Sequence, residues 1–281
     1  MKYAMVKGTD SSHPAIVETE AVRLLGGVRD LAELIAMTPA QRAALVLGEP
    51  HPLATTTLDA PLRPRKNVFC VGRNYLGHAE EVARANGQEL KLPPVPTFFT
   101  KAPTAIAAPG ATLHLEAALS AQYDYEAELA VVIGARCKDV DERSAHEVIF
   151  GYTCLNDVTA RDLQREHGQW FKGKSLDDAC PIGPWIVTAD EIPEPGSLSI
   201  ALRRGGEIKQ QANTNQLIFS IPKLIASLSR GMTLEPGDVI ATGTPDGVGF
   251  ARTPPEFLRD GDLLEVEIER IGILRNRIAI G

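Results

Sequence analysis

The sequence has few of the features that mark secreted, zinc-binding or membrane-spanning proteins. Its four cysteines are Cys70, Cys137, Cys154 and Cys180, and the absence of any Cys-x-x-Cys pair or Cys/His cluster argues against a zinc site or a disulfide framework. No apolar run is long enough to cross a bilayer, and no apolar segment follows the first residues as in a signal peptide. We therefore expect a cytoplasmic protein with reduced, mostly buried thiols.

Positive charge is also scarce. Lysine and arginine number 29 against 36 aspartate and glutamate residues, which gives a net charge of −7 at pH 7. This balance argues against nucleic acid and anionic membranes as partners, and an anionic substrate would need a locally basic site. The 44% hydrophobic and 23% charged residues are those of an ordinary globular protein, and no internal repeat is present.

Prolines divide the chain into a short and a long part. Positions 50, 52, 61 and 64 are proline and interrupt the periodic pattern, so we place a boundary between residues 59 and 65. A small N-terminal α+β domain is predicted over residues 1–62, and a larger domain over residues 63–281. In the small domain we expect strands at 3–7, 15–18 and 21–25, and helices at 31–37 and 39–47, the second capped by Thr38.

The larger part is predicted to be rich in strands. Branched and apolar residues predict strands at 67–72, 97–101, 123–134 and 152–158, and further strands between 185 and 280. Helices are expected at 75–86, at 142–150 and at 221–230, the last capped by Ser220. This pattern predicts a β-rich α+β fold.

Two glutamates alternate with apolar residues in the predicted strand at 123–134. Strand side chains alternate between faces, so Glu126 and Glu128 point the same way while Leu129 and Val131 point toward a core. Asp157, at the end of the next predicted strand, would complete a group of three carboxylates. Two interpretations are open: a solvated polar face, which is the common case, or a site for a divalent cation. Oxygen ligands of this kind select Mg²⁺, Mn²⁺ or Ca²⁺ rather than zinc.

A histidine and a glutamate stand three residues apart in the predicted helix at 75–86. His78 and Glu81 therefore share a helix face, either as an ordinary surface pair or as a catalytic dyad. In a dyad, the carboxylate holds the imidazole in the tautomer that takes a proton from water. Lys101 ends the strand at 97–101, and we interpret it as a solvated lysine rather than as a second basic group of the site.

Five short motifs follow one another along the larger part. They are Gly72-Arg73-Asn74-Tyr75-Leu76-Gly77-His78, Asp124-Tyr125-Glu126-Ala127-Glu128-Leu129, Asn156-Asp157-Val158-Thr159-Ala160-Arg161-Asp162, Gly173-Lys174-Ser175 and Gly243-Thr244-Pro245-Asp246-Gly247-Val248-Gly249. With these motifs the chain resembles the fumarylacetoacetate hydrolase family from residue 67 to the C-terminus. The residues before the boundary show no such resemblance.

The resemblance carries expectations for the fold and for the metal. It implies a mixed β-sandwich roll with few helices, preceded here by the small N-terminal domain, and it implies a homodimer. It also implies that Glu126, Glu128 and Asp157 bind Mg²⁺, with Mn²⁺ or Ca²⁺ as alternatives, and that Lys174 faces the metal.

The resemblance also carries expectations for substrate contacts. His78 and Glu81 match the family's dyad, and residues 161–170 match a mobile lid that orders over the substrate. The substrate contacts that the motifs suggest are Arg73, Tyr75, Arg161, Gln164 and Thr244. The glycines around Thr244 let the backbone approach a ligand, and its hydroxyl can bond a substrate carboxylate.

The implied substrate is a small 2-oxo acid, or its enol, that chelates the metal through its carboxylate and 2-oxo oxygens. Breaking the bond between C3 and C4 leaves an enolate, whose charge the cation and Lys174 stabilise. In a hydrolase, His78 with Glu81 activates the water that attacks the C4 carbonyl. A decarboxylase needs no water, and an isomerase moves a proton between carbons.

One metal site therefore supports several reactions. We place metal-dependent hydrolysis of 2,4-dioxo acids such as acylpyruvates and fumarylpyruvate first, and decarboxylation of oxaloacetate second. Isomerisation or decarboxylation of unsaturated 2-oxo diacids from aromatic catabolism comes third. A metal-stabilised binding protein without turnover comes last, because it would have no need of His78, Glu81 and Lys174, which are all present.

Overall fold

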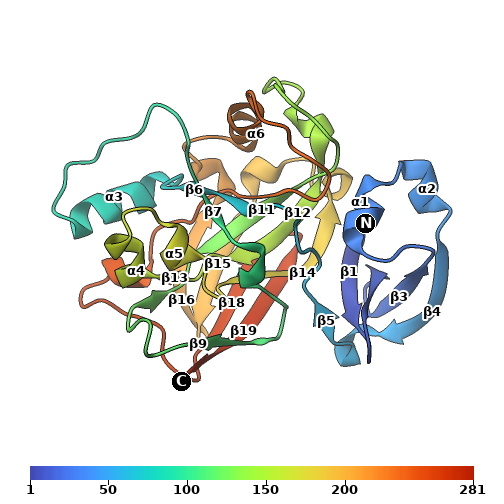
Figure 1. Cartoon of the computed structure of the whole chain (residues 1–281), viewed down its shortest axis with the longest axis horizontal. Coiled ribbons are helices and arrows are strands. Elements are labelled where there is room, and N and C mark those ends of the chain that lie inside the picture. Colours follow the sequence, from blue (N-terminus) through green and yellow to red (C-terminus); the bar gives the residue numbers. More distant parts are fainter.

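Two large β-sheets hold most of the chain in the computed structural model, which describes residues 1–281 (Figure 1). The larger sheet runs in the order β4 (Val46–Pro52), β3 (Ala21–Gly26), β2 (Ser12–Val17), β1 (Lys2–Lys7), β14 (Cys180–Thr188), β12 (Ile149–Asn156), β11 (Ala127–Ile133), β17 (Val239–Ala241), β6 (Val68–Gly72) and β7 (Thr97–Lys101). In addition, β5 (Leu58–Asp59) pairs with β1, and β8 (Ile106–Ala107) pairs with β14. The smaller sheet runs in the order β16 (Glu207–Asn213), β15 (Ser199–Arg204), β18 (Leu263–Ile268), β19 (Gly272–Ile280) and β9 (Thr112–Leu115), and β10 (Tyr123–Asp124) pairs with β13 (Thr159–Ala160). The β-rich α+β fold that the sequence predicts is confirmed.

The helices are few and short. They are α1 (Leu31–Ala36), α2 (Pro39–Ala43), α3 (Leu76–Ala85), α4 (Arg161–Glu166), α5 (Phe171–Lys174) and α6 (Ile221–Ser229). The predicted caps are confirmed, because Thr38 accepts from the Gln41 amide and Ser220 accepts from the Lys223 amide. None of these helices combines the length and the apolar character that crossing a membrane requires.

Strand β11 runs through the centre of the core and fixes the site at its start. All of its residues are buried. Leu129 and Val131 pack in a cluster with residues of the smaller sheet such as Val266, whereas Ala130 and Val132 belong to a second cluster on the other face of β11. A strand held on both faces gives the residues at its end little freedom to move.

The N-terminal part lies at one end of the molecule, in blue in Figure 1, and continues the larger sheet. Strand β1 pairs with β14 through Tyr3 opposite Ile186. Leu34 and Ile35 of α1 belong to the same buried cluster as Ile182 and Ile186 of β14. The sheet and this cluster therefore cross the predicted boundary, and the division into residues 1–62 and 63–281 stays a prediction.

Three local predictions differ from the structure. The helix expected at 39–47 ends at Ala43, and β4 follows, with its prolines on an edge strand where a missing amide is tolerated. The helix expected at 142–150 is a single 3₁₀ turn, η3 (Ala145–Val148), because β12 already begins at Ile149. The strand expected at 123–134 is split into β10 and β11, and the break falls at the second and third residues of the Asp124–Leu129 motif.

Candidate metal centre and active site

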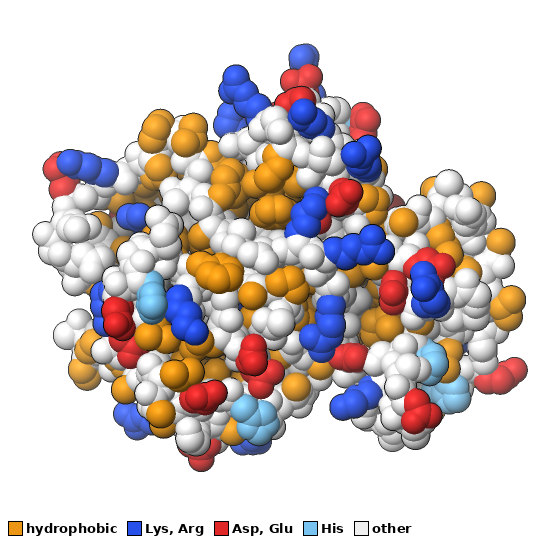
Figure 2. All heavy atoms as spheres, viewed as in Figure 1, with side chains coloured by type: hydrophobic (Ala, Val, Ile, Leu, Met, Phe, Trp, Pro, Cys, Tyr) orange, Lys and Arg blue, Asp and Glu red, His pale blue; other side chains and the backbone are white.

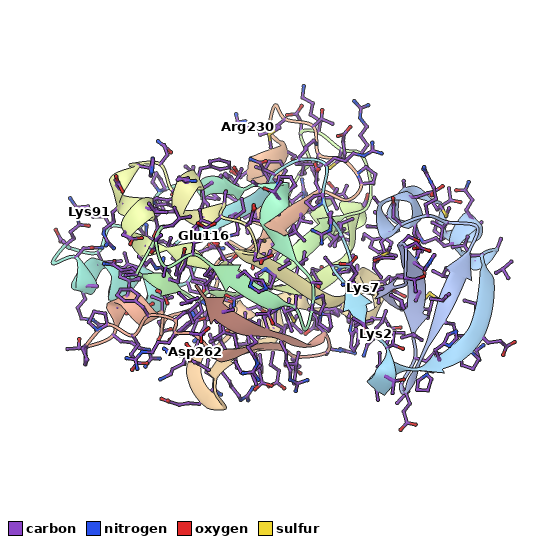
Figure 3. All side chains as sticks on the ribbon, turned by 60° about the horizontal axis from the view of Figure 1, so that its bottom comes forward. Lys2, Lys7, Lys91, Glu116, Arg230 and Asp262 are labelled. Atoms are coloured by element: carbon purple, nitrogen blue, oxygen red, sulfur yellow. The ribbon has the colours of Figure 1, made fainter.

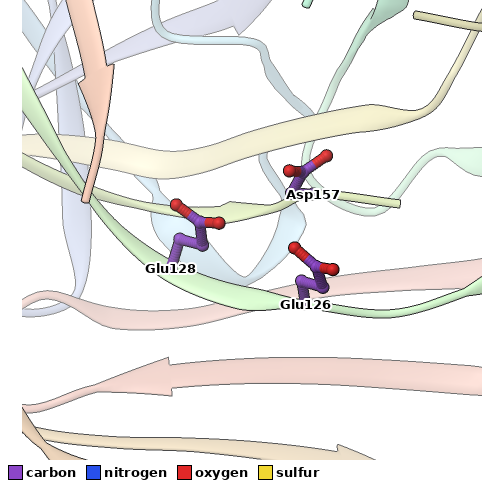
Figure 4. A group of neighbouring side chains, drawn as sticks. All are labelled: Glu126, Glu128 and Asp157. Atoms are coloured by element: carbon purple, nitrogen blue, oxygen red, sulfur yellow. The ribbon is translucent and has the colours of Figure 1, made fainter. Parts of the chain in front are cut away.

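Three carboxylates meet where β11 begins and the neighbouring strand β12 ends (Figure 4). Strands β11 and β12 pair antiparallel with Ala127 opposite Asn156, which brings Glu126, just before β11, beside Asp157, just after β12. The Asp157 amide donates to the Glu126 carbonyl at 2.8 Å. Glu128 lies two residues further along the strand on the same face, as strand alternation predicts. The ligand oxygens of the three side chains lie within 4.8 Å of one another.

Buried cations balance two of these acids. The Lys174 ammonium donates to Glu126 at 2.8 Å and to Asp157 at 2.7 Å. Arg161 pairs with Glu126 at 2.7 Å, and Lys101 pairs with Asp157 at 2.6 Å. Burial opposes ionisation of Glu126, but Lys174 and Arg161 together hold the pKa of its carboxyl below the usual value.

Glu128 has no such partner. Its side chain accepts from the Gly243 amide at 2.7 Å and makes no ion pair. Burial raises the pKa of Glu128 well above the usual value, and the charges of Asp157 and Glu126 raise it further. A buried carboxylate that lacks a counter-ion, within a set of oxygen ligands, fits a divalent cation such as Mg²⁺, Mn²⁺ or Ca²⁺.

The predicted dyad forms within α3. His78 Nδ1 lies 2.7 Å from Glu81 Oε1, and both side chains are buried. The second oxygen of Glu81 accepts from the Gly247 amide at 2.8 Å, so the glycine-rich loop fixes the carboxylate. Glu81 therefore orients the imidazole, whose Nε2 makes no hydrogen bond within the chain.

Gly173 explains how Lys174 reaches the acids. A Cβ at Gly173 would lie 2.5 Å from the Gln164 amide nitrogen and 2.7 Å from the Ala160 carbonyl oxygen, so only glycine allows α5 to cross α4 this closely. Burial lowers the pKa of Lys174, but Asp157 and Glu126 raise it more, and the net change is upward. The side chain is therefore held as an ammonium group.

One cavity of about 410 Å³ collects most of the predicted residues, and we call it the catalytic cavity. Its lining includes Arg73, His78, Glu126, Glu128, Arg161, Gln164, Lys174 and Thr244. Asp157 and Glu81 stand directly behind this wall, bonded to Lys174 and His78. Tyr75 does not line the cavity: its ring is 1% exposed, and its hydroxyl has no hydrogen-bond partner.

Some of the residues predicted to contact the substrate already bond other residues of the chain. Arg161 is buried and also pairs with Asp124 at 2.9 Å, and its guanidinium donates to Gln164 at 3.2 Å. Thr244 accepts from the Gln210 side chain at 2.8 Å. The predicted lid over 161–170 contains α4, and its mobility stays a prediction.

For two residues of the site, the sequence does not predict the environment that the structure shows. The interpretation of Lys101 as a solvated lysine is wrong, because its side chain is fully buried and donates to Asp157 and to the Val158 carbonyl. Asp124 belongs to one of the five motifs, but its sequence context indicates no role for it. It is buried, and besides pairing with Arg161 it accepts from the Gly249 amide at 2.8 Å. The sequence gives only a weak indication that Lys101 pairs with Asp157. Each residue stands at the end of a predicted strand, and only the sheet topology brings the two strand ends together.

The order of the motifs and this geometry are matched by a known family. Its sequence model, described as "Fumarylacetoacetate (FAA) hydrolase C-terminal", matches residues 67–279. The chain belongs to the fumarylacetoacetate hydrolase family. The match begins at β6 and ends in β19, so it takes in the dyad, the three carboxylates, Lys174 and the glycine-rich loop.

Individual relatives of this family member carry different reaction names. Oxaloacetate tautomerase YisK of Bacillus subtilis (strain 168) is 47% identical over 229 residues, which are 81% of this chain and 75% of the relative. A solved fumarylacetoacetate hydrolase from the psychrophilic Exiguobacterium antarcticum superposes with a TM-score of 0.85 at 38% identity, covering 100% of both chains. A solved 5-carboxymethyl-2-hydroxymuconate delta-isomerase from Mycobacterium smegmatis superposes with a TM-score of 0.82 at 33% identity, again covering 100% of both chains. The family therefore contains enzymes, and membership alone does not select one reaction.

Proposed function

We propose that this chain is a divalent-metal-dependent enzyme that interconverts the keto and enol forms of oxaloacetate or a closely related 2-oxo diacid. One observation supports this most. A buried His78–Glu81 dyad, the Lys174 ammonium and the carboxylates of Glu126 and Glu128 meet at one cavity. A base and a fixed positive charge that both reach one small acid are what proton transfer next to a carbonyl requires.

The reaction moves one proton. His78 Nε2 takes a proton from C3, and the electron pair of that C–H bond moves toward the 2-oxo oxygen. That oxygen takes one proton from water, and the His78 imidazolium returns one proton to water. Glu81 supports the imidazolium that forms, and Lys174 stabilises the charge that gathers on the oxygen. Glu126, Glu128 and Asp157 would hold the divalent cation, which when bound supplies Lewis-acid polarisation of the 2-oxo group.

We rank the candidate reactions differently here from the order that the motifs suggest, in which hydrolysis comes first. Tautomerisation needs only the base and the positive charges, whereas hydrolysis also needs a positioned water. The relative that is 47% identical over most of the chain is named an oxaloacetate tautomerase. We therefore place proton transfer first and cleavage of the C3–C4 bond second.

The test follows the decay of enol-oxaloacetate by its ultraviolet absorbance at fixed Mg²⁺. We expect His78→Ala to lower kcat/KM by about 10²–10⁴-fold, the usual contribution of a general base. The control is His114→Ala, because His114 is exposed on β9 and lies outside the catalytic cavity. A second pair is Glu81→Gln against Glu80→Gln, whose side chain is exposed on the same helix. Full activity of His78→Ala would contradict the proposal.

Hydrolysis of acylpyruvates is the second candidate, since the dyad could equally activate a water and a solved structure that is 38% identical is a fumarylacetoacetate hydrolase. His78→Ala should then lose acylpyruvate hydrolysis by about 10²–10⁴-fold while any oxaloacetate decarboxylation survives much better. Lys174→Ala should impair both, because both reactions develop the same enolate charge. A panel of acylpyruvates, oxaloacetate and unsaturated 2-oxo diacids ranks the candidates by kcat/KM.

A further inference from the structure

Tyr75 has a buried hydroxyl that no group of the chain bonds. Its side chain is 1% exposed, and its hydroxyl is the one tyrosine hydroxyl among the buried atoms without a hydrogen-bond partner. A buried hydroxyl is normally paired, because an unpaired one costs free energy that a phenylalanine ring would not cost. The proposed proton transfer makes no use of this hydroxyl, and Tyr75 does not line the catalytic cavity.

The position of the Tyr75 ring is fixed by its neighbour in the chain. The Asn74 side chain donates to the Thr242 carbonyl at 2.8 Å and accepts from the Phe219 amide at 2.8 Å. The Asn74 carbonyl also accepts from the Ile218 amide at 2.7 Å. Because the backbone is held in this way and the ring is enclosed, the hydroxyl has little freedom to change its direction.

The same contacts lead to the metal centre through Gly243. A Cβ at Gly243 would lie 2.8 Å from the Asn74 Cβ, so a side chain there would push the loop away. The Gly243 amide donates to Glu128 Oε2 at 2.7 Å. Burial raises the pKa of Tyr75, and the charge of Glu128 raises it further. The hydroxyl and this carboxylate therefore lie in one buried region, although no hydrogen bond joins them.

Glu128 is also the least restrained of the three carboxylates. Two basic side chains hold Glu126, and two hold Asp157. Glu128 makes no ion pair, and only one of its oxygens accepts a hydrogen bond. Its other oxygen can therefore turn toward a bound cation. A carboxylate that binds a metal is usually oriented by a further hydrogen-bond donor behind it.

We propose that Tyr75 is a positioning residue of the metal centre, whose hydroxyl donates to the Glu128 carboxylate when the divalent cation is bound. The donor is fixed and the acceptor is free to turn, so the bond forms by a movement of Glu128 alone. It orients the one carboxylate that no basic side chain holds. This inference rests on the metal site of the proposed function, and it gives Tyr75 a role other than contact with the substrate.

Titration calorimetry with Mg²⁺ alone tests this inference without any substrate. The three carboxylates are the only group of three or more His, Cys, Asp or Glu side chains whose ligand atoms lie within 4.8 Å of one another. On the face drawn in Figure 2, acidic side chains lie among basic and apolar ones and form no large patch. The heat of binding therefore reports one site. Tyr75→Phe, which removes only the hydroxyl, should weaken the affinity for Mg²⁺ by about tenfold.

Tyr123→Phe is the matched control. The Tyr123 side chain is 2% exposed, and its hydroxyl donates at 2.9 Å to the carbonyl of Glu116, an exposed residue that Figure 3 labels. This variant loses a hydrogen bond outside the metal centre, so it should lower the midpoint of thermal unfolding with and without Mg²⁺. Its affinity for Mg²⁺ should be unchanged. Tyr75→Phe should not lower the midpoint in the absence of Mg²⁺, since it loses no hydrogen bond there.

The absorbance of tyrosine gives a second readout that does not depend on stability. A phenol that donates to a carboxylate absorbs at longer wavelength, so Mg²⁺ should shift the near-ultraviolet spectrum of the wild-type protein and of Tyr123→Phe, but not that of Tyr75→Phe. The inference is overturned if Tyr75→Phe binds Mg²⁺ as tightly as the wild-type protein, if it keeps the spectral shift, or if it lowers the metal-free midpoint as Tyr123→Phe does. If the wild-type protein binds no Mg²⁺, the metal site of the proposed function itself fails, and this inference fails with it.

Discussion

Glu126 and Glu128 occupy equivalent faces of one strand, yet their surroundings differ in charge. Glu126 is held by two cations, whereas Glu128 has only the Gly243 amide. Without metal, Glu128→Gln should therefore raise the midpoint of thermal unfolding, because it removes an acid whose ionisation is opposed by burial and by two neighbouring carboxylates. Glu126→Gln should lower stability by about 3 kcal/mol, since it leaves buried cations with one partner fewer.

Added Mg²⁺ separates metal binding from these charge effects. The wild-type protein should gain about 2.7 kcal/mol at a Mg²⁺ concentration one hundred times the Kd, and both variants should lose this gain. Thermal unfolding with and without Mg²⁺ measures these changes in stability, and titration calorimetry gives the affinity of each variant for Mg²⁺. Unchanged Mg²⁺ affinity in either variant would contradict the assignment of the three carboxylates as the metal site.

The sequence predicts which residues of the site lie together only where a periodic pattern or a short spacing places them on one face of an element. Strand alternation places Glu126 and Glu128 on one face, and the helical spacing joins His78 to Glu81, as the 2.7 Å contact confirms. Lys101 was not predictable in this way, since its partner Asp157 stands 56 residues further along the chain. Only the sheet topology brings the two together.

At the scale of elements, Trp170 is the contact that holds the segment between α4 and α5 against the sheet. Its ring packs so closely on Gly72 that a Cβ there would clash with it, and it meets the Phe99 ring edge-on at 5.2 Å. Phe171, the next aromatic residue in the chain, is 45% exposed. Of the two aromatic residues, only Trp170 is therefore packed against the sheet.

We expect Trp170→Ala to speed hydrogen exchange of the amides in 163–169 by about tenfold, because an edge-on aromatic pair contributes up to about 1.5 kcal/mol. Trp170→Phe should recover part of this protection, and Phe171→Ala should change it little. In the wild-type protein, oxalate with Mg²⁺ should slow exchange of the same amides, as expected of a lid. Equal protection with and without oxalate would show that the segment is a fixed wall.

At the scale of the whole molecule, the two predicted domains share a sheet and a buried cluster. Leu34 of α1 is fully buried in the cluster that contains Ile182 and Ile186 of β14. We propose that residues 1–62 and 63–281 are two domains that unfold together. Leu34→Ala should therefore destabilise the whole chain by about 2–5 kcal/mol and lower its single unfolding midpoint by about 4–10 °C.

Calorimetry combined with the near-ultraviolet signal of Trp185 checks this coupling, because Trp185 lies on β14 and bonds the Ile271 carbonyl at 2.7 Å. Both probes should report one transition, and Leu34→Ala should move both equally. Val46→Ala is the control, since this side chain is 71% exposed on the edge strand β4 and should shift stability by less than about 0.5 kcal/mol. If Leu34→Ala splits the heat signal and leaves the Trp185 transition in place, residues 1–62 unfold on their own, and β14 does not need β1 to keep the metal centre folded.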